Sequence, residues 1–74
     1  MPYDKFLSGP DVDALESMVD RYSLGHVVQA LAQITEEKQE HIRETWGDES
    51  GVKLYRAGAI ALQRAEKRLT AIGL

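Results

Sequence analysis

The residues of this chain that could do chemistry gather in one stretch, TEEKQEHIRETW, at positions 35–46. Glu37 and His41 are spaced one helical turn apart, so both side chains could face one cation. A tetrahedral metal site needs three or four ligands, and the other histidine, His26, lies about four turns earlier on a different helical face. We therefore expect no metal site and no cofactor.

The same stretch also contains part of a possible hydrolase motif. EEKQE, at positions 36–40, resembles the EExxE half-motif of the all-α nucleotide pyrophosphohydrolases of the MazG type. That family completes its magnesium site with a second acidic motif, ExxD, on the following helix. Here Glu66 has Leu69 three residues later, so the second motif is missing. The chain also has no cysteine and no glycine-rich phosphate loop, and we expect it not to be an enzyme.

Lys38 is unusual because it falls on an apolar stripe. The stripe consists of aliphatic residues at helical spacing, Leu24, Val27, Val28, Leu31, Ile34 and Ile42. Thr35 lies in the same stripe, and His41 lies at its edge. Because burial of an unpaired ammonium is very costly, one reading is that Lys38 reaches water along its alkyl stem where the core ends. The other is a polar patch that recognises a small anion or nucleotide, or fixes the register of a dimer.

Charge is distributed unevenly along the chain. Residues 1–25, 26–49 and 50–74 carry −3, −4 and +4, which gives the net charge of −3. The basic residues of the last third fall on one side of a helix, as Lys53, Arg56, Arg64, Lys67 and Arg68. Ile60 lies among them. The stripe is either a solvated face, a contact for an acidic protein, or a contact for nucleic-acid phosphates, although the acidic remainder argues against nucleic acid.

Local signals divide the chain into a tail and three helices. We expect a tail over residues 1–9 and helices over about residues 10–21, 24–46 and 50–72. Pro10 suits a first helical turn, Ser23 is a good N-cap, and Gly47 and Gly73 suit the residues after a helix. Trp46 closes the second helix, where we expect it either to cap the core or to serve as an aromatic contact for a partner. No period-two alternation suggests a strand.

These elements predict one all-α domain over residues 1–74. The two long helices, joined by a short turn, form an antiparallel hairpin that the short first helix covers over only half its length. A chain of 74 residues without cysteine has a marginal core, and the third helix is rich in alanine, which allows close helix approach. We expect a homodimer that forms a helical bundle; the alternative is a three-helix monomer.

Composition places the chain in a broad class only. Its hydrophobic fraction of 43% is too high for a disordered protein, and its apolar runs are far shorter than a membrane span. The start of the chain lacks the pattern of a secretory signal, so we expect a cytoplasmic protein that makes no membrane contact. The favoured function is a protein–protein interaction module, with a profile that fits a regulator or inhibitor from a phage or mobile element.

Overall fold

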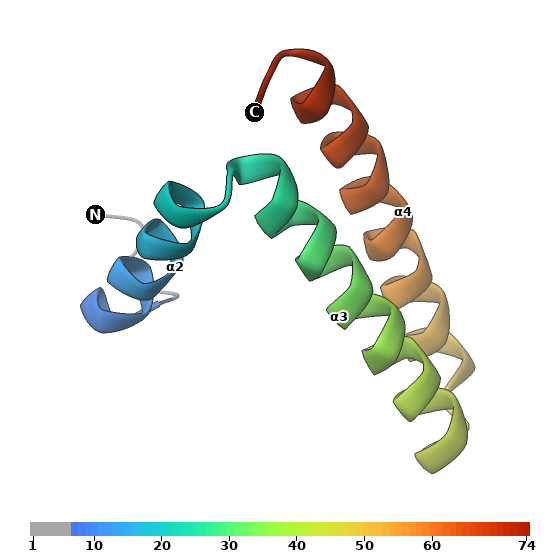
Figure 1. Cartoon of the computed structure of the whole chain (residues 1–74). Coiled ribbons are helices and arrows are strands. Elements are labelled where there is room, and N and C mark those ends of the chain that lie inside the picture. The colour runs from blue at the N-terminus through green and yellow to red at the C-terminus, as the bar shows by residue number, and fades with distance from the viewer. Residues whose placement is uncertain (1–6) are drawn as a thin grey trace.

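The computed structural model describes residues 7–74, and this part of the chain is helical without a strand. Helix α2 spans Gly9–Arg21, α3 spans Leu24–Thr45 and α4 spans Glu49–Ala71 (Figure 1). Each helix begins and ends within one residue of the range expected from the sequence. Of the expected tail, residues 1–6 lie outside the described residues, and Gly9 is already helical.

Short-range hydrogen bonds explain where the helices begin. The Ser8 hydroxyl accepts a hydrogen bond from the Asp11 main-chain N–H at 3.2 Å, and the Ser23 hydroxyl accepts one from His26 N–H at 3.1 Å. Both serines satisfy N–H groups that the first turn of a helix leaves without a carbonyl partner. Asp48 occupies the N-cap position of α4, but its side chain makes no capping bond.

Helices α3 and α4 lie side by side as an antiparallel hairpin about 33 Å long (Figure 1). At one end the chain turns through Gly47, whose φ of 61° belongs to the left-handed region that favours glycine. At the other end Gly73, with φ 92°, turns the chain back toward α3. There the Gly25 N–H donates to the Leu74 carbonyl oxygen at 2.6 Å, so the hairpin is fastened at both ends.

Glycine is required at position 25 because the backbone of α3 and the backbone of Leu74 nearly touch there. A Cβ added to Gly25 would lie 3.0 Å from the Leu74 oxygen and 3.2 Å from its carbon. We expect Gly25→Ala to lower the free energy of unfolding by about 1–2 kcal/mol, as overpacking does elsewhere. Urea titration followed by circular dichroism measures this loss. Gly9→Ala, in the first turn of α2 with nothing within 4 Å of the new carbon, is the control and should be neutral or stabilising.

The core between α3 and α4 is made of small side chains. Among residues 7–74 the buried apolar residues are Ala32, Val52 and Ala59, and no large side chain of this range is fully buried. Thr35 also packs at this contact: its hydroxyl donates to the Leu31 carbonyl at 2.7 Å, and its methyl group lies toward Gly58. The hairpin is therefore closely packed but has a thin core, as expected where alanine and glycine face each other.

Helix α2 stands apart from the hairpin. Among the described residues it packs on α3 alone, it has no buried residue, and it diverges from α3 toward its N-terminus (Figure 1). The radius of gyration of the chain is 14.2 Å, whereas a compact domain of this length has about 11 Å. The single chain is thus an open arrangement of helices.

Candidate functional site

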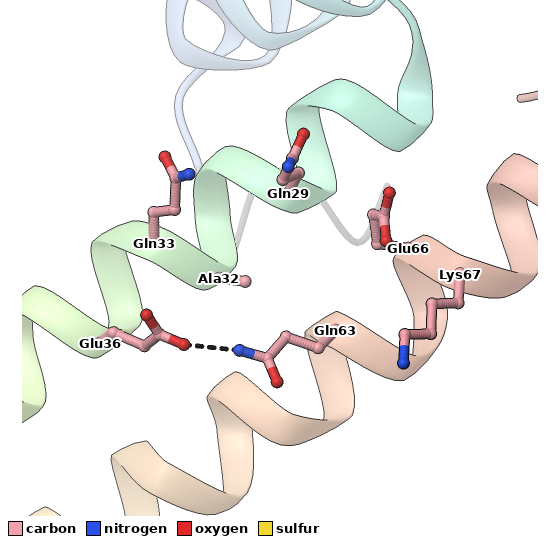
Figure 2. A pocket seen from close by; sticks show the side chains of 7 residues that line it. All are labelled: Gln29, Ala32, Gln33, Glu36, Gln63, Glu66 and Lys67. Atoms are coloured by element: carbon pink, nitrogen blue, oxygen red, sulfur yellow. Dashed lines mark hydrogen bonds between the residues drawn. The ribbon is translucent and has the colours of Figure 1, made fainter.

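One side of the hairpin is polar. The side chains of three glutamines, two glutamates and a lysine line a cleft there, together with Ala32: Gln29, Gln33, Glu36, Gln63, Glu66 and Lys67 (Figure 2). The Gln63 amide donates to a Glu36 carboxylate oxygen at 2.5 Å and joins α4 to α3. No group of three or more histidine, cysteine or acidic side chains within residues 7–74 is placed to hold a metal ion.

The opposite side of the hairpin is apolar. On α3, Leu31 lies two residues from Gln33, and on α4, Ala65 lies two residues from Lys67. Two residues correspond to about half a turn of helix. Because Gln33 and Lys67 both line the polar cleft, Leu31 and Ala65 both face away from it. The hairpin as a whole is amphipathic.

A groove of about 470 Å³ lies on this apolar side, between α2 and α3. Its lining is almost entirely aliphatic and aromatic: Leu15, Met18, Tyr22, His26, Val27, Ala30, Leu31 and Ile34. Leu31 remains 40% exposed and Ile34 48% exposed. Two large aliphatic side chains of this groove are therefore open to solvent in the single chain.

A second uncovered strip runs along α4. It is lined by small and aliphatic side chains with two arginines at its edge: Ala61, Arg64, Ala65, Arg68, Leu69 and Ile72. Ile72 is 72% exposed. The basic residues Arg64 and Arg68 therefore border an apolar strip on the surface of α4.

Three of the residues singled out from the sequence, Glu37, Lys38 and His41, lie together on α3. With Ile34 they line a shallow hollow on the surface. Lys38 and His41 are exposed, and the His41 Nδ1 lies 3.5 Å from the Thr45 hydroxyl. Glu37 lines the same hollow, so an acidic residue accompanies Lys38 there. Thr35 is half-buried between the helices and contributes to packing.

Trp46 does not cap the core, which corrects one of the two expectations for it. Its side chain is 73% exposed. Helix α3 ends at Thr45, and Val52 is buried at this end of the hairpin while Ile42 packs close to Gly51. Aliphatic side chains therefore fill the contact at this end of the hairpin, and the indole lies outside it. The second expectation, an aromatic contact for a partner, stays a prediction.

The other basic-stripe residues are on the surface of α4. Arg56, Arg64 and Lys67 are exposed, and Ile60 is 42% exposed. Lys67 lies at the polar cleft and Arg64 at the apolar strip, so the stripe divides between the two sides of the helix.

The groove between α2 and α3 was missed in the sequence. The signal that could have found it is the helical spacing of Leu15, Met18 and Tyr22, which places the three side chains on one side of α2. No helix of the described residues is long and apolar enough to cross a membrane. Comparison with protein-family models, with curated proteins and with solved structures found no match to this chain.

Proposed function

We propose that the protein is a cytoplasmic, non-enzymatic interaction module that forms a homodimer through the apolar side of its α3–α4 hairpin. The observation that carries the proposal is the open groove beside α3, where Leu31 and Ile34 are exposed while the buried apolar residues are two alanines and a valine. Burial of aliphatic side chains is the main favourable term in helix association, and these side chains have no cover in a single chain.

The accessible surface of the chain supports this proposal. The chain presents 5973 Å², whereas a compact monomer of 8.3 kDa presents about 4,600 Å². The excess of about 1,400 Å² is larger than the ~800 Å² that each partner covers in a standard interface. A subunit that completes its core with a second copy is expected to have such an excess.

Two hairpins that join by their apolar sides form a four-helix bundle. In this dimer the polar clefts face water on both outer sides, and Arg56, Ile60 and Lys67 remain accessible to another protein. A chain with no cysteine suits the reducing cytoplasm.

The proposal is tested by the solution mass of the wild type and of Leu31→Glu, measured by light scattering after size exclusion. We expect the wild type at about twice 8.3 kDa and Leu31→Glu at the monomer mass, because the variant places a carboxylate in the apolar interface. The dissociation constant should rise on the order of a hundredfold. Gln33→Glu, two residues away on the polar side, is the matched control and should stay dimeric.

A wild type that runs at the monomer mass at every concentration would show the proposal to be wrong, as would a Leu31→Glu variant that remains dimeric. If the Leu31→Glu variant loses its helical circular-dichroism signal, the solution mass of the wild type alone tests the homodimer. The Tm of a dimer rises with protein concentration, and that of a monomer does not.

A further inference from the structure

We infer that the groove between α2 and α3 of one copy receives the α4 strip of a second copy, and that the exchange is reciprocal. This inference rests on the proposed homodimer and specifies which surfaces meet in it. The two surfaces are the groove bordered by Leu15, Met18 and Leu31 and the strip bordered by Ala61, Ala65 and Ile72.

The sizes and shapes of the two surfaces correspond. Helix α2 has 13 residues and is about 20 Å long, and the strip from Ala61 to Ile72 extends about 16 Å along its helix. Ala61 and Ala65 project little from α4, so a helix bearing them can enter deeply between two others. The larger side chains of Met18 and Tyr22 then find cover that their own chain does not provide.

The two surfaces also lie at the same end of the hairpin. The hydrogen bond from Gly25 to Leu74 places the start of α3 beside the end of α4. The groove follows the first half of α3, and the strip follows the last half of α4. A two-fold axis parallel to the hairpin therefore brings each groove over the partner's strip without a shift along the axis.

Charge favours the same pairing. Helix α2 carries four acidic residues against one basic residue, Arg21, and one of the four, Asp11, lies on the groove side of the helix, one turn before Leu15. The strip on α4 is edged by Arg64 and Arg68. Oppositely charged surfaces attract and suppress the alternative in which like surfaces meet.

One pair of charges is specific to this arrangement. Asp11 precedes Leu15 by one helical turn and lies on the groove side of α2. Helix α2 diverges from α3 toward its N-terminus in the single chain (Figure 1). In the two-fold dimer we infer that α2 closes onto the partner's α4 and runs in the same direction, with Tyr22 beside the partner's Ile72. Counting back eleven residues puts Asp11 at the level of Ala61, within reach of the long side chain of Arg64.

The test uses charge reversal at both positions, with dissociation constants measured by sedimentation equilibrium at low salt. We expect Asp11→Lys and Arg64→Glu each to weaken self-association about tenfold, because each places like charges together twice in a symmetric dimer. A one-to-one mixture of the two variants should form a heterodimer of nearly wild-type affinity. The controls are Asp13→Lys, also in the first turns of α2 but on its other face, and Arg56→Glu on α4.

A covalent test is independent of the strength of surface charges. The chain has no cysteine, so single cysteines report contacts cleanly. Leu15→Cys mixed with Ala65→Cys in oxidised glutathione should give the mixed disulfide on a non-reducing gel, since a disulfide requires Cα atoms within about 7 Å. Glu16→Cys, on the far side of α2, should not cross-link to Ala65→Cys.

The two proposals fail in different ways. A dimeric wild type in which both reversals behave like their controls, and in which Leu15→Cys and Glu16→Cys cross-link equally, would overturn the groove-and-strip pairing and leave the homodimer standing. A monomeric wild type would overturn both. Restored affinity in the mixture together with selective cross-linking supports the pairing.

Discussion

Replacement of Ala59 by leucine is expected to cause the largest loss of stability of any single aliphatic change in this chain. Ala59 is 3% exposed and lies where α4 packs against α3. Three added carbon atoms have no space there, so the two helices must separate along their contact. Overpacking of this kind costs about 1–3 kcal/mol. For a domain of this size the Tm should fall by roughly 10 °C, measured by thermal unfolding in far-UV circular dichroism.

Ala57→Leu provides the matched control for this change. Ala57 is exposed on the same helix, two residues away, and leucine is nearly as good a helix former as alanine. Its Tm should stay within a few degrees of the wild type. Equal Tm values for the two variants would mean that the α3–α4 contact does not hold the fold together.

Replacement of Lys38 by leucine is expected to have the largest favourable effect. Lys38 lies on the apolar side of α3, one turn after Ile34, and it is exposed in the single chain. In the proposed dimer its ammonium must either reach water along its alkyl stem or lose hydration. Leucine removes that penalty and adds apolar surface to the interface. We expect the dissociation constant to fall about tenfold and the Tm to rise by several degrees.

Lys53→Leu is the control, since Lys53 is an exposed lysine on α4 away from the groove and from the strip. It should leave the dissociation constant unchanged. A Lys38→Leu variant that forms a larger oligomer instead would assign to the lysine a role in limiting assembly. A variant that associates no more tightly than the wild type would place Lys38 outside the interface.

The sequence was sufficient to predict the helices because the signals that start and stop them are local. Ser23 caps α3 by accepting a hydrogen bond from the main-chain N–H of His26, three residues later. The turn after α3 requires a left-handed φ, and Gly47 adopts it because glycine has no Cβ. Such signals act within a few residues and need no knowledge of the rest of the fold. The antiparallel hairpin follows from them, because the turn between the long helices is short.

The direction in which each helix faces was not predictable in the same way. The apolar stripe of α3 is wider than the contact of this helix with α4. The spacing of large aliphatic residues such as Leu31 predicts that they face the core. The structure instead packs α3 on α4 through Ala32 and Ala59, since small side chains allow the backbones to approach most closely. The choice between two apolar faces depends on how two helices pack against each other. The spacing of apolar residues along one helix carries no information about that packing. The groove was missed for this reason, and of the two expectations for Trp46 the structure contradicts the one in which it caps the core.

The separation of α2 from the hairpin has a consequence for the order of folding. A helix of 13 residues without a buried side chain gains little from its own chain, and isolated helices of this length are marginal in water. The contacts that hold the hairpin together lie between α3 and α4 and do not involve α2, so the hairpin can form before α2 is ordered. Helix α2 is then a separate cooperative unit of low stability, which opens without unfolding the rest. In the proposed homodimer the ordering of α2 would be coupled to association, so that the last part of each chain to fold would be the part that the second chain completes.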